Sequence, residues 1–173
     1  MMQNGTVPPT EQRHPNTMEL DTMSAEQLVR VMNEEDATVA PAVAREMAPI
    51  AAAAERITRG LRQGGRLIYV GAGTSGRLAL LDALECPPTF NADPQQVQAV
   101  VAGGMSSDVS SSAEFEDRAD LGRQAVVERG IGSNDVVVGV AASGATPFTV
   151  AVLEEARRHG AATVALCCVA GSP

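Results

Sequence analysis

Two short segments of the sequence combine glycine with serine and threonine hydroxyls, a combination that suits phosphate binding. The first covers residues 71–76 (GAGTSG), and the second covers residues 142–147 (ASGATP). Backbone N–H groups at the start of a helix bind anions, and nearby hydroxyls add further donors. Each segment alone also fits a plain turn, in which glycine allows the bend and a hydroxyl caps the next helix. The candidate phosphate-binding residues are Gly73, Thr74, Ser75, Ser143, Gly144 and Thr146.

Residues 71–76 also match the G-x-G-x-x-G spacing of dinucleotide-binding proteins. A nicotinamide-binding domain needs an acidic residue at the end of its second strand to hold the ribose. The strand expected at 97–102 runs into Gly103 and Gly104 without an acid, and Asp93 lies before that strand. The hydroxyls of the segment therefore favour a terminal phosphate over a pyrophosphate, and a dinucleotide enzyme is the weaker alternative.

A carboxylate follows the first glycine segment, in residues 84–89 (LECPPT). Pro87 and Pro88 cannot continue a helix without losing hydrogen bonds, so they predict a helix end near residue 84. Glu85 would then be a carboxylate held at a stiffened helix end. Spacing alone also allows an ordinary solvated glutamate, because most glutamates are exposed.

The elements that must position these residues follow from hydrophobic patterning. Short apolar runs rich in β-forming residues predict buried strands at 66–71, 97–102, 135–141 and 162–168, and helical patterns separate them at 76–84, 112–129 and 147–159. Strands that alternate with helices pair in parallel through right-handed crossovers. We therefore expect a three-layer, doubly wound α/β fold. Both glycine segments fall at carboxyl ends of strands, where such sheets bind ligands.

The first third of the chain predicts helices that precede this sheet. Ser24 and Gln27 form a capping-box pattern that predicts a helix over 24–36, and Pro41 suits the start of a second helix, which Pro49 would kink, up to residue 64. Residues 1–16 are polar and proline-rich, as in a mobile arm. The expected organisation is an arm at 1–16, a helical segment at 17–65 and a sheet domain at 66–173.

Charge and cysteine content restrict the partners. The net charge of −8 and the pI near 4.7 exclude general electrostatic attraction to nucleic acid or to an anionic membrane. Three cysteines, in a chain without a signal-peptide pattern, favour a cytoplasmic protein over a disulfide framework. The two histidines and the cysteines show no zinc-ligand spacing, so no metal site is expected.

Several motifs together resemble one family. Residues 68–77 (IYVGAGTSGR), residues 85–89 (ECPPT), residues 135–147, and residues 10–13 with 16–17 are similar to N-acetylmuramic acid 6-phosphate etherases. That family has the sugar isomerase (SIS) phosphosugar-binding fold, and its regulatory relatives include the glucokinase regulatory protein. The chain departs from the family at Ala145, where the family has arginine, at residues 168–171, and in its shorter length.

The resemblance implies a reaction and a site. The reaction is cleavage of the D-lactyl ether of N-acetylmuramic acid 6-phosphate, giving N-acetylglucosamine 6-phosphate and D-lactate in cell-wall recycling, with no cofactor and in a homodimer. Glu85 would be the acid that protonates the departing lactate and later activates water. Glu116 would be the base that removes the C2 proton, with Glu114 as its rival. A non-catalytic phosphosugar-binding or regulatory module is the alternative, favoured by Ala145 and the short chain.

Overall fold

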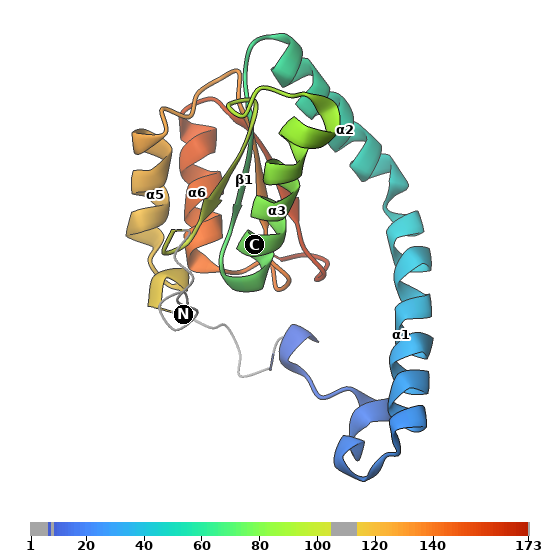
Figure 1. Cartoon of the computed structure of the whole chain (residues 1–173). Coiled ribbons are helices and arrows are strands. Elements are labelled where there is room, and N and C mark those ends of the chain that lie inside the picture. The colour runs from blue at the N-terminus through green and yellow to red at the C-terminus, as the bar shows by residue number, and fades with distance from the viewer. Residues whose placement is uncertain (1–6, 8, 105–113, 173) are drawn as a thin grey trace. The chain divides into compact units, whose positions relative to one another are not determined.

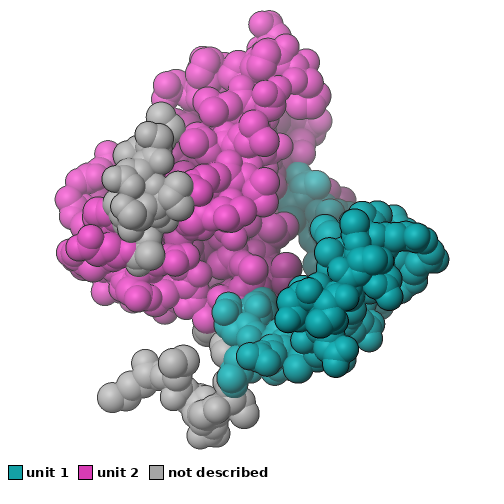
Figure 2. Space-filling view, turned by 60° about the horizontal axis from the view of Figure 1, so that its bottom comes forward, with its two compact units in different colours: residues 1–54 teal, residues 55–173 magenta. Residues whose placement is uncertain are grey.

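The computed structural model describes residues 7, 9–104 and 114–172, and the chain divides into two compact units (Figures 1 and 2). The first unit is residues 1–54 and the second is residues 55–173. In the first unit, three short 3-10 turns precede the long helix α1 (Ala25–Arg45). Helix α2 (Met47–Arg62) crosses the boundary between the units. The turns are Pro9–Glu11, Pro15–Thr17 and Leu20–Thr22.

The structure confirms the start of α1 and corrects its end. The Ser24 side chain accepts from the Gln27 backbone N–H at 3.3 Å, and the Gln27 side chain accepts from the Ser24 N–H at 2.8 Å, which completes the capping box. The expected helix start at Pro41 is wrong, because Pro41 lies inside α1 and the break falls at Glu46. Pro49 instead occupies the first turn of α2, where a backbone N–H has no helical partner to lose.

The second unit is built on a four-stranded parallel sheet in the order β2-β1-β3-β4. Strand β1 pairs with β2 and with β3, so that Gly71 lies between Val101 and Val140. All four strands lie within two residues of the predicted runs, which confirms the α/β prediction. They are β1 (Leu67–Gly71), β2 (Val97–Val101), β3 (Val136–Val140) and β4 (Ala162–Leu166).

Helices cover both faces of this sheet. Helix α3 (Gly73–Phe90) connects β1 to β2, and α5 (Ala119–Glu128) and α6 (Pro147–Arg158) lie side by side (Figure 1). The chain leaves β1 in one direction, toward β2, and leaves β3 in the opposite direction, toward β4. With right-handed crossovers, α3 therefore covers one face while α5 and α6 cover the other. The strand order reverses between β1 and β3, which makes this the switch point of the sheet.

Two predicted helix boundaries are wrong. Helix α3 does not end near residue 84 but continues through Pro87 and Pro88 to Phe90, and Asn91 closes it in the left-handed conformation (φ 52°, ψ 34°). Packing against the sheet outweighs the local cost of two prolines. The helix expected over 112–129 is interrupted at Arg118, with one helical turn at 114–116 before it and α5 after it. Residues 112 and 113 lie outside the described part of the chain.

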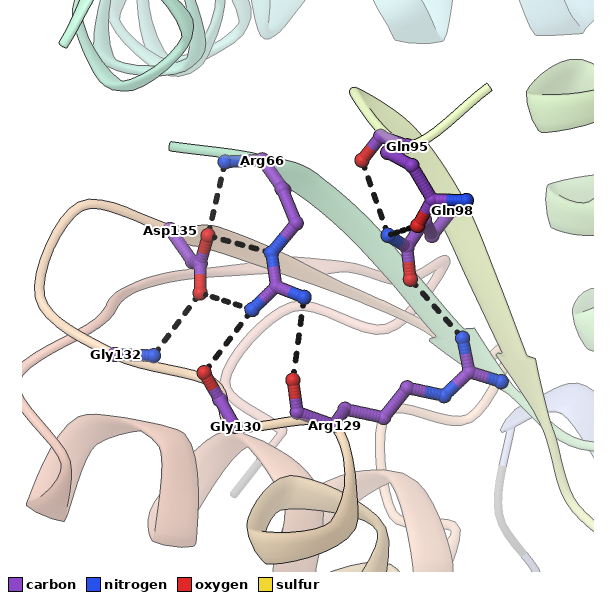
Figure 3. Close-up of polar contacts among 7 residues, drawn as sticks. All are labelled: Arg66, Gln95, Gln98, Arg129, Gly130, Gly132 and Asp135. Carbon is purple, nitrogen blue, oxygen red and sulfur yellow. Dashed lines mark hydrogen bonds and ion pairs between the residues drawn. The ribbon is translucent and has the colours of Figure 1, made fainter. Parts of the chain in front are cut away.

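The amino end of the sheet is fastened by a buried ion pair. The Asp135 carboxylate, whose side chain is 8% exposed, accepts from the Arg66 backbone N–H at 2.9 Å and from Arg66 Nε and Nη2 at 3.0 and 2.8 Å (Figure 3). The Gly132 N–H also donates to it at 3.0 Å. Burial by itself raises the pKa of Asp135, but the hydrogen bonds from Arg66 and Gly132 outweigh burial and hold that pKa below its usual range.

The core of the second unit consists of small and branched side chains on both sides of the sheet. Val70, Val137 and Val152 have no exposed surface, and Phe148 is the aromatic residue of the buried cluster. Close packing of such side chains fixes the strand ends and hence the loops that follow them. Across the described residues, no helix has the length and apolar character needed to cross a membrane.

Candidate functional site

The first glycine segment forms a tight turn between β1 and α3. A side-chain carbon on Gly76 would stand 2.7 Å from the Gly71 carbonyl oxygen, and one on Gly71 would stand 2.8 Å from the Gly76 nitrogen. The two glycines therefore let the first turn of α3 rest directly on the end of β1. Gly73, the first residue of α3, has φ +53°, a conformation that glycine adopts without strain.

The start of α3 leaves donors available to a ligand. The first bond within the helix runs from the Gly76 N–H to the Ala72 oxygen at 3.1 Å. The N–H groups that precede Gly76 in the helix have no carbonyl partner within it. Thr74 and Ser75 lie in this first turn and Ala72 is the N-cap, so neither hydroxyl serves as the helix cap. The turn thus presents the donor types that an anion requires.

The second glycine segment has a similar construction between β3 and α6. Thr146 is the N-cap of α6, but its side chain makes no capping hydrogen bond, and Pro147 begins the helix. The Ser143 hydroxyl accepts from the Ala145 N–H at 3.2 Å, which shapes the turn. Gly144 has φ +71°. Ala145 is exposed, and its methyl group offers no charge to a ligand.

The sheet brings the two glycine segments together. Gly71 and Val140 are register partners on neighbouring strands, and the segments begin directly after them. Both segments therefore lie at the carboxyl end of the sheet, on either side of the switch point between β1 and β3. In open α/β sheets, this position is the usual place where a ligand binds. The structure thus gives all six candidate phosphate-binding residues a common location, as the sequence predicted for the strand ends.

Glu116 lies at the same end of the sheet. A side-chain carbon at Gly73 would stand 3.7 Å from Glu116 Oε1, so the carboxylate is beside the first glycine segment. Phe115 fixes this placement, because it packs directly on Gly103 after β2 and contacts the buried core. Glu114, the rival candidate, is exposed. The geometry therefore favours Glu116 as the carboxylate that could reach a bound ligand.

Glu85 lies far from the glycine segments of its own chain. It is twelve residues after Gly73 in α3, a distance of about 18 Å along the helix at 1.5 Å per residue. Helix α3 runs back along β1 (Figure 1), and the five residues of β1 span only about 16 Å. Glu85 therefore lies level with the amino end of the sheet. The idea of a carboxylate held at a helix end is wrong, because the helix continues past the prolines.

Asp82, which the sequence analysis missed, supports the same course of α3. Burial, and then a hydrogen bond with Asp82, raise the pKa of the Tyr69 hydroxyl in the middle of β1. Burial and the Asp82 charge also raise the pKa of the Cys86 thiol. Asp82 and Cys86 are four residues apart and so share one side of α3. The sequence signal for this contact was a tyrosine, Tyr69, inside a predicted strand and an acid, Asp82, in the helix that follows that strand.

Solved structures show the same fold. The phosphoheptose isomerase of Neisseria gonorrhoeae superposes with a TM-score of 0.63 at 20% identity, covering 82% of this chain and 73% of that chain. The phosphoheptose isomerase of Francisella tularensis superposes with a TM-score of 0.65 at 19% identity, covering 84% and 76%. These likenesses confirm the SIS-type architecture and carry nothing about activity.

Curated sequences show a nearer relationship. N-acetylmuramic acid 6-phosphate etherase 2 of Enterococcus faecalis is 49% identical over 92% of this chain, and the etherase of Mycolicibacterium smegmatis is also 49% identical over 92%. The chain spans about half the length of these relatives, 54% and 53%. Residues 49–157 match the family described as the glucokinase regulatory protein N-terminal SIS domain. The chain therefore belongs to this SIS-domain family, with N-acetylmuramic acid 6-phosphate etherases as its curated homologues.

Proposed function

We propose that the chain carries the phosphosugar-binding and catalytic part of an N-acetylmuramic acid 6-phosphate etherase of cell-wall recycling. The observation that supports it most is the meeting of two hydroxyl-bearing glycine segments and the Glu116 carboxylate at one end of the sheet. The sugar phosphate would accept hydrogen bonds from both segments. The 49% identity to curated etherases supports N-acetylmuramic acid 6-phosphate as the sugar. A cytoplasmic location follows from the same proposal.

The chemistry is an elimination followed by an addition. The sugar opens to its aldehyde, which makes the C2 proton acidic, and Glu116 removes that proton as a general base. The C3–O bond then breaks as Glu85 protonates the departing D-lactate, leaving a C2–C3 double bond. Water then adds to C3, and Glu85 takes a proton from that water. Glu116 returns its proton to C2, which gives N-acetylglucosamine 6-phosphate. The protons balance without a cofactor or metal.

Glu85 would serve the site of a second copy of the chain, because about 18 Å of helix separates it from its own glycine segments. It lies on the side of α3 opposite the buried Ala79 and Ala83, and it shares that side with Leu78 and Leu81. These two leucines are 61% and 55% exposed. An exposed apolar face of this kind favours protein association. A homodimer formed through it would present Glu85 to the partner.

The direct test of the proposed function is release of D-lactate. The purified chain is incubated with N-acetylmuramic acid 6-phosphate, and lactate is measured with a coupled dehydrogenase. We expect lactate from the unmodified chain and none from the chain incubated with N-acetylmuramic acid that lacks the phosphate. Phosphosugar binding without lactate would contradict the etherase and favour a non-catalytic phosphosugar module, the alternative that Ala145 supports.

A mixing experiment tests whether Glu85 acts across two copies. Glu85→Gln and Glu116→Gln chains are inactive separately but combine into mixed dimers when they are expressed together. If the carboxylates come from different copies, activity returns to about a quarter of the unmodified rate, because half the dimers are mixed and each holds one complete site. Continued inactivity of the mixture would place both carboxylates in one chain and contradict the shared site.

A further inference from the structure

The segment that follows β4 is folded onto the second glycine segment. The Ala141 N–H donates to the Leu166 oxygen at 3.1 Å, and the Cys168 N–H donates to the Ala142 oxygen at 2.9 Å. These two bonds continue the pairing of β3 with β4 beyond the strand ends. The residues after β4 are thereby held at the same end of the sheet as the phosphate-binding candidates.

Ser172 reaches Gly144 at the centre of that second segment. A side-chain carbon on Gly144 would stand 2.5 Å from Ser172 Cβ and closer still to Ser172 Oγ. No side chain fits at position 144 while Ser172 lies there. The serine thus occupies the space that a residue other than glycine would fill.

The hydroxyl of Ser172 retains hydrogen-bonding capacity. Its oxygen lies 3.3 Å from Cys167 Sγ, and sulfur is a weak hydrogen-bond partner. The side chain is half-buried, so it is ordered by its surroundings and still reachable by a ligand. Ser172 and Ser143 both adjoin Gly144, Ser172 by packing and Ser143 along the chain, although 29 residues separate them in the sequence.

We propose that Ser172 is a further ligand of the sugar phosphate and donates its hydroxyl to a phosphate oxygen held by the second glycine segment. This inference rests on the proposed function and assigns one more residue to that site. A phosphate has several strong acceptor oxygens, and hydroxyls from neighbouring loops can converge on them. The loop after β4 would thus join the loops after β1 and β3. Glycine at position 144 leaves room for the serine and also adopts φ +71° without strain.

The experiment measures binding of N-acetylglucosamine 6-phosphate by titration calorimetry, with N-acetylglucosamine and inorganic phosphate as separate ligands. Ser172→Ala is expected to weaken binding of both phosphate compounds about tenfold, the usual loss for a hydrogen bond to a charged group. Gly144→Ala is expected to weaken it at least as much, because its methyl group would clash with Ser172 and because alanine is strained at φ +71°. Ser133→Ala, an exposed serine outside the site, is the control and should bind normally. Thermal unfolding without ligand should be the same for Ser172→Ala and the unmodified chain.

The outcomes separate the two proposals. If the unmodified chain binds N-acetylglucosamine 6-phosphate and Ser172→Ala binds it equally well, the role of Ser172 is overturned while the phosphosugar site stands. A loss of affinity that is matched by early unfolding of Ser172→Ala would also overturn it, since the serine would then only support the fold. If the unmodified chain binds no phosphate compound, the phosphosugar site itself is wrong, and the inference fails with it.

Discussion

The two ends of the parallel sheet use their polar groups in opposite ways. At the amino end, the Asp135 carboxylate accepts four hydrogen bonds from Arg66 and Gly132, and Arg66 also donates to the carbonyl oxygens of Arg129 and Gly130. At the carboxyl end, the first turn of α3 has helix-start N–H groups and hydroxyls that the helix does not use. The polar groups of the amino end satisfy one another, whereas the carboxyl end has donors that can give hydrogen bonds to a bound anion.

The polar groups of the amino end therefore serve the stability of the domain, and those of the carboxyl end are free to bind a ligand. A buried charge that is fully hydrogen-bonded holds two strands together, and removing its partner is costly. Open donors at strand ends contribute little to folding but bind an anion when one arrives. Removing the Asp135 hydrogen bonds at the amino end should therefore change unfolding, and removing the polar groups at the carboxyl end should change binding and turnover.

The largest effect is expected at Glu116. Glu116→Gln keeps the shape of the side chain and removes the base, so we expect lactate release to fall about 10²–10⁴-fold. Binding of N-acetylglucosamine 6-phosphate and the unfolding midpoint should stay close to those of the unmodified chain. Glu114→Gln is the matched control and should keep its activity. Loss of activity in Glu114→Gln with full activity in Glu116→Gln would assign the base to the other carboxylate.

At the opposite end, Asp135→Ala should mainly affect stability. The substitution leaves Arg66 without its buried partner, so the free energy of unfolding should fall by about 3–5 kcal/mol in urea denaturation. Asp120 offers a comparison, because it pairs with Arg118 on the surface, and Asp120→Ala should change stability little. Equal effects of the two substitutions would show that the Asp135 bonds do not fasten the sheet.

Two glycines offer a matched pair, one at each end. Gly76→Ala places a methyl group against the Gly71 backbone, and we expect a loss of about 1–3 kcal/mol in stability together with weaker phosphosugar binding. Gly132→Ala has open space around the new methyl group and keeps the N–H that donates to Asp135. It should leave both properties nearly unchanged. A tolerant Gly76 would contradict the close contact between α3 and β1.

The smallest effect is a dependence of stability on acid. The pKa of Asp135 is lower in the folded chain than in the unfolded one. Its contribution to the stability of the fold is therefore complete above the pKa of the unfolded chain, ~3.9, and is lost as the pH falls through the lower pKa of the folded chain. The difference in unfolding free energy between the unmodified chain and Asp135→Asn should therefore shrink below about pH 4. A difference that stays constant down to pH 3 would argue against a lowered pKa.

The sequence was sufficient for the sheet and for its carboxyl end. Buried parallel strands are continuous apolar runs, and the glycine segments that follow them are local features, so both could be placed without the structure. Their neighbouring positions then followed from topology. The pairing of Arg66 with Asp135 could not be predicted in this way, because 69 residues separate them. Their shared position, directly before two apolar strands, was the available signal.

The course of α3 was the main failure of the sequence reasoning. The rule that proline ends a helix is a local rule, and here packing of α3 on the sheet keeps the helix intact through Pro87 and Pro88. Because of that error, the sequence predicted Glu85 at a fixed helix end, whereas it lies on an exposed face within α3. The proposed catalytic pair is therefore one carboxylate beside the glycine segments, Glu116, and one, Glu85, for which we propose a role in the site of a second copy.

The most direct measurement of the central claim is the backbone amide NMR spectrum of the chain during titration with N-acetylglucosamine 6-phosphate. We predict shifts in the amide signals of residues 71–76 and 142–146 in the two glycine segments, and unchanged signals for Arg66 and Gly132 at the amino end. N-acetylglucosamine without phosphate should cause no such shifts. Shifts confined to the amino end, or no shifts in the two glycine segments at a saturating concentration, would contradict a phosphosugar site at the carboxyl end of the sheet.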